Sequence, residues 1–109
     1  MKELINQHDA EGRRHGVWES YCSDGTLVWR AHYHQGRAHG LWEWYRSDGT
    51  LECRRHYHHG KWHGVRESYW GNGTLMWREK WHHGDRRGLE TGWDSQGRIR
   101  HKAYNLVIR

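Results

Sequence analysis

Two stretches of the sequence are nearly the same, HYHQGRAHGLWEWYRSDGTLECRR at residues 32–55 and HYHHGKWHGVRESYWGNGTLMWRE at residues 56–79. The flanking segments 8–31 and 80–103 follow the same pattern with more substitutions. Self-similarity at a fixed period is the signature of a repeat architecture, in which each unit packs on its neighbours and the terminal units are atypical. The chain therefore divides into four 24-residue repeats, and we expect residues 104–109 to form a closing strand.

Glycine recurs at three places in each repeat, 24 residues from its counterpart in the next. These glycines are Gly12, Gly36, Gly60 and Gly84; Gly16, Gly40, Gly64 and Gly88; and Gly25, Gly49, Gly73 and Gly97. The last set mostly follows Asp or Asn, and Asp-Gly and Asn-Gly favour tight hairpin turns because glycine readily adopts a positive φ. The segments between turns are rich in Trp, Tyr, Thr, Leu and Val, as strands are. The sequence predicts an all-β fold, a single-layer antiparallel β-meander built from four hairpin repeats.

The composition fits one small domain, residues 1–109. Mean hydropathy is −1.27 and only 34% of residues are hydrophobic, but nine Trp and six Tyr supply apolar area that this average hides. No apolar run approaches the ~20 residues of a membrane span, and the first five residues lack the apolar stretch of a secretory signal. With only two cysteines, Cys22 and Cys53, we expect a cytoplasmic protein without a disulfide framework.

Side chains alternate between the two faces of a strand, so like positions of successive repeats form columns. The apolar and aromatic columns predict a packing face, made of Val17, Leu41, Val65 and Leu89; Tyr21, Tyr45, Tyr69 and Trp93; Leu27, Leu51, Leu75 and Ile99; Trp29, Cys53 and Trp77; and Tyr33, Tyr57 and Trp81. A carboxylate column, Glu19, Glu43 and Glu67, has the same parity. We expect these carboxylates to be paired or to lie at an edge.

The opposite parity is both aromatic and cationic, and it holds the predicted partner-binding residues. These are Trp18, Arg30, Trp42, Trp44, Arg54, Trp70 and Arg78. Two registers fit the Asp-Gly turns. A three-residue loop with a glycine bulge sets Trp18 near Arg30 and Trp42 near Arg54, whereas a two-residue loop sets the carboxylate column opposite the arginine column. We favour the first register, because the second mixes apolar and charged columns.

The repeat resembles the membrane occupation and recognition nexus (MORN) repeat, especially its bacterial antitoxin-type variant. The resemblance rests on Tyr-x-x-Gly-x-x-x-Gly cores at residues 33–40 and 57–64, and on residues 81–88 with Trp in place of Tyr. Tyr-x-x-Asp-Gly elements at residues 21–25 and 45–49 also fit. The resemblance extends over all four repeats and implies an array of β-hairpins. It also implies the roles of that family, which span toxin neutralisation, scaffolding and proposed lipid contact.

Metal binding and catalysis are the first alternatives. The His-Tyr-His stretches at residues 32–34 and 56–58 place imidazoles, common zinc ligands, on one strand face. However, one of the same columns holds Lys80, and His39 and His63 fall on turns, so we predict no metal site. A repeated carboxylate column gives nearly identical environments instead of the unequal pair that acid–base catalysis needs. We therefore predict neither an enzyme nor a cofactor.

Charge and aromatic content indicate a binding function. The net charge is +5 and the pI about 9.5, and Trp, Tyr and Arg are enriched at interface hot spots. We expect a non-enzymatic module that occludes or inhibits a partner protein with an acidic surface, as an antitoxin, immunity protein or phage-type inhibitor does. The alternative is nucleic-acid binding through the Trp and Arg side chains. We do not expect membrane binding, because no block of Lys and Arg supports it, and a thin sheet predicts dimerisation through a face or an end.

Overall fold

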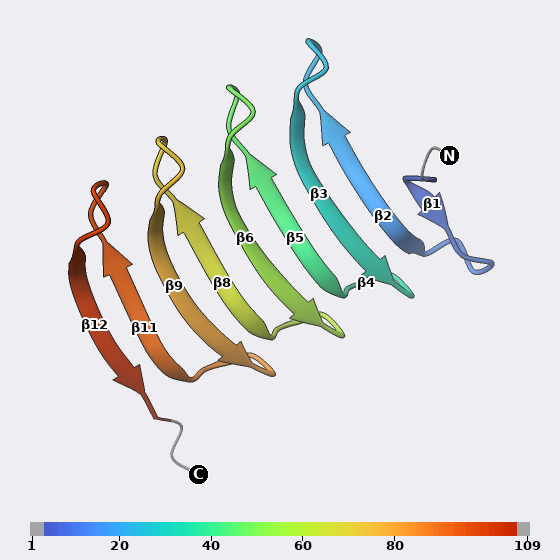
Figure 1. Ribbon diagram of the computed structural model, residues 1–109. Coiled ribbons are helices and arrows are strands. Elements are labelled where there is room, and N and C mark those ends of the chain that lie inside the picture. Colours follow the sequence, from blue (N-terminus) through green and yellow to red (C-terminus); the bar gives the residue numbers. More distant parts are fainter. Residues whose placement is uncertain (1–3, 107–109) are drawn as a thin grey trace.

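The computed structural model describes residues 4–106, and within that range every regular element is a β-strand. The long strands are β2 Arg14–Tyr21, β3 Leu27–His34, β5 Gly40–Tyr45, β6 Leu51–His58, β8 Gly64–Tyr69, β9 Leu75–His82, β11 Gly88–Trp93 and β12 Ile99–Asn105. They pair antiparallel in chain order, with β1 Gln7–His8 outside β2. Figure 1 shows this array of successive hairpins. The predicted single-layer antiparallel meander is confirmed.

Three further short strands form small hairpins at one end of the sheet. They are β4 Arg37–Ala38, β7 Lys61–Trp62 and β10 Asp85–Arg86, which pair with the ends of β3, β6 and β9. Each hairpin turns through two residues with positive φ: Gln35, His59 or His83, and the glycine that follows. Turns with positive φ at both central residues match the twist of a hairpin. These small hairpins, together with the residue that follows each short strand, are called the hairpin edge below.

The Asp-Gly turns lie at the other end of the sheet (Figure 1). In the first of them the Cys22 amide donates to the Thr26 carbonyl at 2.8 Å, and the Gly25 amide donates to the Cys22 carbonyl at 3.0 Å. Gly25 has a φ of 90°, which few other residues tolerate. The Asp24 carboxylate accepts from the Thr26 amide at 2.9 Å. This is the predicted three-residue loop with a glycine bulge.

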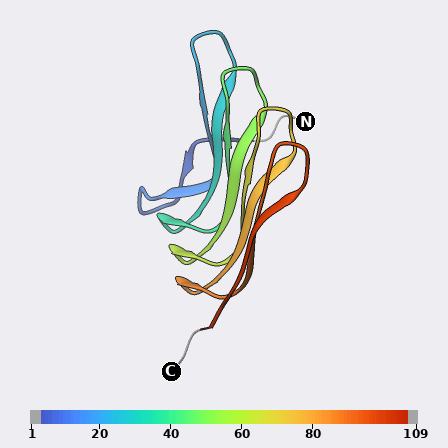
Figure 2. The ribbon, with the colours of Figure 1, turned by 90° about the vertical axis from the view of Figure 1, so that its left-hand side faces the viewer.

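The sheet is a thin curved layer, seen edge-on in Figure 2 with no second layer against either face. Its extents are 45 × 41 × 22 Å. Ala31 is the one fully buried apolar residue among residues 4–106, whereas the buried polar residues include Glu79 and Glu90. Stability must therefore come from contacts between neighbouring side chains on each face. Tyr104 and Asn105 of the expected closing strand continue β12, and residues 107–109 lie outside the described residues.

Candidate functional site

A second bulge, beside each Asp-Gly turn, sets the register of the sheet. Tyr21 pairs with Leu27, as the three-residue loop requires. The next pair is Ser20 with Trp29, so Val28 has no pairing partner on β2. The same irregularity recurs in each of the three following repeats. One extra residue shifts the pairing by one position and exchanges the faces of the side chains beyond it. The favoured register is therefore wrong, although the turn on which it was based is present.

The shifted register builds a row of alternating charge across one face, as the second register had predicted. In strand order the row reads Glu19, Arg30, Glu43, Arg54, Glu67, Arg78, Thr91 and Lys102. Arg30 lies 3.1 Å from Glu19, and Arg54 lies 2.9 Å from Glu67. The hydrogen bond that Arg54 donates to the Glu67 carboxylate raises the pKa of Arg54. This surface is called the charged face, and Glu19 and Glu67 are paired there, which is one of the two arrangements expected for this column.

The seven predicted binding residues do not form one surface. Arg30, Arg54 and Arg78 belong to the charged face, whereas Trp18, Trp42 and Trp44 pair with Ala31, Arg55 and Cys53 on the opposite face. Trp70 follows β8, where its backbone amide closes the Gly73 turn and its indole N–H donates to the Trp93 carbonyl at 3.1 Å. The expected pairs of Trp18 with Arg30 and of Trp42 with Arg54 are thus wrong, because the bulge shifts the pairing between Trp and Arg.

The predicted packing face is divided in the same way. Some of its columns lie on the charged face. These are the column that begins with Val17 in β2 and Leu41 in β5, and the Tyr and Leu columns near the Asp-Gly turns, where Tyr21 pairs with Leu27. Its Trp29 and Tyr33 columns lie on the face of Trp18 and Trp42, since Trp29 pairs with Trp44. Each observed face therefore combines columns from both predicted faces, which strict alternation of side chains along a strand does not predict.

Aromatic rings on the second face form a continuous chain of contacts. The chain runs through Trp18, Tyr33, Trp42, Tyr57, Trp62 and Trp81, with ring centroids 4.7–6.3 Å apart, and Trp44 joins it 5.6 Å from Trp42. All seven rings are partly exposed. Most contacts are tilted or edge-to-face, the arrangements that aromatic quadrupoles favour. These seven residues define the aromatic face.

Arginines that sequence reasoning did not select lie over these rings. The Arg14 guanidinium is 4.4 Å from the centroid of Trp18. The Arg55 guanidinium is 4.5 Å from Trp44 and 4.6 Å from Trp62, and that of Arg66 is 5.5 Å from Trp62. Each such cation–π contact contributes about 0.5–1 kcal/mol at an exposed site. The predicted combination of indole and guanidinium on one surface exists, but with a different set of arginines.

Positive charge gathers where β6 meets β8. Arg46, Arg55 and Arg66 line a hollow of about 340 Å³, together with Ser68 and one acidic residue, Glu52. The Nε atoms of Arg55 and Arg66 are buried and have no hydrogen-bond partner. Arg66 has one acidic neighbour, with its guanidinium 2.9 Å from Glu79, and Arg46 donates to the Leu51 carbonyl. This hollow can accept a carboxylate or another small anion.

Glu79 is the more deeply buried of two carboxylates on this face, with 2% of its surface exposed against 6% for Glu90. It accepts hydrogen bonds from the indoles of Trp77 and Trp81, both at 3.0 Å, and from Arg66 at 2.9 Å. Burial alone would raise its pKa, but these three hydrogen bonds outweigh that effect and hold the pKa below 4.5. Glu79 therefore stays ionised and anchors the rings of β9.

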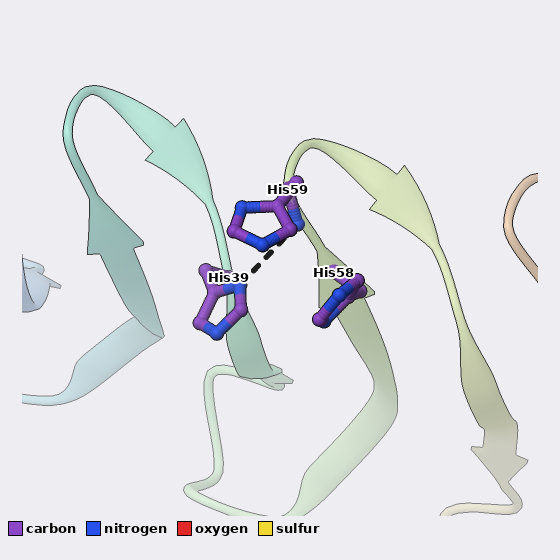
Figure 3. Close-up of side chains that lie close together, drawn as sticks. All are labelled: His39, His58 and His59. Carbon is purple, nitrogen blue, oxygen red and sulfur yellow. Dashed lines mark hydrogen bonds between the residues drawn. The ribbon is translucent and has the colours of Figure 1, made fainter.

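Histidines gather along the hairpin edge. The rings of eight of them are in consecutive contact: His15, His34, His39, His58, His59, His63, His82 and His83. Two groups of three bring one ring nitrogen from each residue within 4.8 Å of the others. Figure 3 shows the first group, His39, His58 and His59. The turn histidines His39 and His63, which sequence reasoning set aside, are the ones that meet the strand histidines.

Three of these histidines, His59, His63 and His83, have a lowered pKa. Burial lowers the pKa of His59, and the neighbouring His58 and His39 lower it further. Burial also lowers the pKa of His63 and His83, again assisted by adjacent imidazoles. At pH 7 these rings are neutral, and each has one nitrogen lone pair to offer.

The sequence matches no protein family model, and neither a curated protein nor a solved structure matches the chain. The resemblance to MORN repeats therefore stays a prediction. Within residues 4–106 there is also no helix with the length and apolarity to cross a membrane.

Proposed function

We propose that this protein is a non-enzymatic module that binds an acidic surface of another protein through its aromatic face. The observation that carries the proposal is a chain of seven partly exposed aromatic rings, with arginines over them, on a sheet face that no second layer covers among the described residues. Trp, Tyr and Arg are the residues that most often dominate binding energy at protein interfaces.

The extent of this surface suits a protein partner. The sheet measures 45 × 41 Å in its two long directions, and a stable interface needs about 800 Å² from each partner. The rings are held in place by one another and by indole hydrogen bonds, such as that from Trp42 to the His32 carbonyl at 3.0 Å. Because the side chains are already ordered, little conformational entropy is lost when a partner binds.

Charge selects the chemistry of that partner. The hollow where β6 meets β8, called the arginine hollow here, is lined by Arg46, Arg55 and Arg66. The Nε atoms of Arg55 and Arg66 have no acceptor. A buried donor without an acceptor is costly, so a carboxylate that supplies one gains more than an exposed ion pair would. An Asp or Glu side chain beside apolar residues is the protein group that fits both the hollow and the adjacent rings.

The ring geometry favours protein over nucleic acid. Single-strand binders stack successive bases on open aromatic faces. Here guanidinium groups lie over Trp18, Trp44 and Trp62, and the rings meet one another edge-to-face or tilted. The guanidinium groups over these three rings compete with a base for the same stacking position. Inhibition of a partner by occlusion in the cytoplasm, as in antitoxin-type MORN proteins, is the form of this function that the sequence resemblance suggests.

Arg54 and Arg55 provide a matched pair of variants, because they are adjacent in β6 but project to opposite faces. Binding is measured by fluorescence anisotropy to a peptide of alternating Glu and Leu, and to a random single-stranded oligonucleotide of the same charge. We expect Arg55→Gln to weaken peptide binding about tenfold, in line with the loss of one charge-assisted hydrogen bond. Arg54→Gln should bind as the parent chain does.

Equal loss of binding in both variants would exclude the aromatic face as the specific surface. Tighter binding of the oligonucleotide than of the peptide, with a steep dependence on salt, would support the nucleic-acid alternative instead. Self-association of the protein that blocks peptide binding, seen by analytical ultracentrifugation, would identify a second copy of the chain as the occupant.

A further inference from the structure

We propose that the hairpin edge binds two transition-metal ions of the zinc class, one in each of two histidine triads. The first triad is His39, His58 and His59, drawn in Figure 3, and the second is His63, His82 and His83. This assignment is independent of the proposed partner-binding function, because the triads lie outside the aromatic face.

Each triad is assembled by the same three backbone positions. His58 and His82 are the last residues of β6 and β9. His59 and His83 follow them in the left-handed turn position, with φ of 48° and 46°. The third member, His39 or His63, lies just beyond the short strand of the preceding repeat. Because the backbone geometry repeats every 24 residues, two copies of one site follow from the fold itself.

One hydrogen bond in each triad identifies the ring nitrogen whose lone pair a metal would use. The Nδ1 atom of His39 accepts the His59 amide at 3.2 Å, and that of His63 accepts the His83 amide at 3.3 Å. A neutral imidazole that accepts at Nδ1 carries its proton on Nε2. These contacts are long, and a metal can take the same lone pair without any proton moving. The lowered pKa of His59, His63 and His83 keeps the rings unprotonated at neutral pH.

The donor set selects the metal. Three imidazoles without a carboxylate suit zinc, copper or nickel and exclude calcium and magnesium, which require oxygen ligands. Zinc binds imidazole nitrogen at about 2.0–2.1 Å and commonly keeps three protein ligands with a fourth position open. The nitrogens within 4.8 Å of one another must therefore draw closer by small rotations of the rings. The triad histidines are all partly or fully exposed, so this movement is unobstructed.

An incomplete copy of the site lies where the first repeat meets the second. At the equivalent positions it has His15, His34 and Gln35, and the rings of His15 and His34 are 5.7 Å apart. Gln35 adopts a φ of 51°, so glutamine fits the left-handed position that His59 and His83 occupy. The variants His59→Gln and His83→Gln therefore remove one ligand each while the turn keeps a residue that the chain already uses there.

The test titrates the metal-free full-length chain with zinc chloride by isothermal calorimetry at neutral pH. We expect two zinc ions per chain, one in His59→Gln and in His83→Gln, and none in the double variant. His101→Gln, which alters a histidine outside the hairpin edge, should retain two. Gln35→His completes the third triad and should raise the number to three. Far-ultraviolet circular dichroism verifies that each variant is folded.

A parent chain that binds no zinc at micromolar concentration would overturn the assignment, as would two ions retained by the double variant. An unchanged stoichiometry in Gln35→His would show that the three backbone positions do not define the site. In the bound protein, the His59 and His83 amide resonances in ¹⁵N spectra should shift on zinc addition, since each amide loses its imidazole acceptor. Unshifted amides with zinc bound would contradict the proposed ligation through Nδ1.

Discussion

Glu79 offers the sharpest test of how this thin sheet is stabilised. Its carboxylate is buried, accepts from Trp77, Trp81 and Arg66, and lies 3.5 Å from the Arg86 guanidinium, so it contacts two rings and two guanidinium groups at once. In Glu79→Gln the side chain keeps its size but loses its charge, and one amide oxygen replaces two acceptors. The amide nitrogen then faces an indole N–H or a guanidinium, which are both donors.

The expected cost follows from these contacts. A hydrogen bond to a charged group contributes about 1.5–3 kcal/mol, and breaking a buried ion pair costs about 3–5 kcal/mol. Arg66 is 31% exposed, so water replaces part of the lost interaction. We expect Glu79→Gln to lower the free energy of unfolding by about 2–3 kcal/mol, or the melting temperature by about 10–15 °C.

The matched control is Glu67→Gln on the charged face. Glu67 also has arginine neighbours, Arg54 at 2.9 Å and Arg78 at 3.9 Å, but these side chains are 38% and 50% exposed. Pairs of this kind contribute at most about 1 kcal/mol. Urea unfolding followed by tryptophan fluorescence and by circular dichroism compares the two variants. A loss in Glu79→Gln no larger than that in Glu67→Gln would refute the reasoning.

The difference in free energy of unfolding between the parent chain and Glu79→Gln should depend on pH with a definite sign. The pKa of Glu79 is below 4.5 in the folded chain, so the contribution of the ionised carboxylate is fully present above that value and is lost as pH falls through the folded pKa. The difference between the parent chain and Glu79→Gln should therefore be constant at neutral pH and should narrow below about pH 4.5. A stability difference that persists in acid would mean that the charge of the Glu79 carboxylate does not cause it.

Three further predictions concern other parts of the sheet. Thr91→Glu restores the alternating row beside Arg78 and should stabilise the chain by about 0.5–1 kcal/mol in urea unfolding, whereas a loss would show that the row is not electrostatically continuous. Gly92→Ala places a methyl group 3.0 Å from the rigid Trp77 ring and should destabilise by about 1–3 kcal/mol; an unchanged midpoint would contradict the close packing there. Three histidines of the hairpin edge have a lowered pKa: His59, His63 and His83. Since their charged neighbours are other imidazoles, Arg or Lys, metal-free stability should be full above about pH 6.5 and decline as pH falls below it, which thermal melts across that range would detect.

The sequence was sufficient for the architecture and the turns, because glycine spacing and Asp-Gly pairs are strong local signals. It was insufficient for the register, since one unpaired residue per repeat changes which side chains share a face. That residue is Val28, Glu52, Met76 or Arg100, a column with no common chemical character. A column without a consistent type, between columns that have one, is the signal of a bulge that could have corrected the prediction.

The sequence predicted tryptophans and arginines on one surface, but not which arginines lie beside the tryptophans. Trp18, Trp42 and Trp44 do lie together on one face, but the arginines over Trp18 and Trp44 are Arg14 and Arg55. Periodicity selected Arg30, Arg54 and Arg78 because they recur at one position. That recurrence reflects their pairing with the carboxylates of the neighbouring strands, and so indicates a structural role in the charged face. Whether any of these residues binds a partner stays a prediction.

The charged-face columns change little between repeats, whereas columns on the opposite face vary. Across the four repeats the charged-face columns read Glu, Glu, Glu, Thr at positions 19, 43, 67 and 91, and Arg, Arg, Arg, Lys at positions 30, 54, 78 and 102. On the other face, the columns read Trp, Trp, Arg, Glu at positions 18, 42, 66 and 90, and Ala, Arg, Glu, Ala at positions 31, 55, 79 and 103. A column that is the same in every repeat serves the contact between repeats, because that contact is the same each time. A column that differs gives each strand its own chemistry: positions 18 and 42 carry indoles, whereas positions 66 and 90 carry ionic groups, so the two ends of this face are not equivalent.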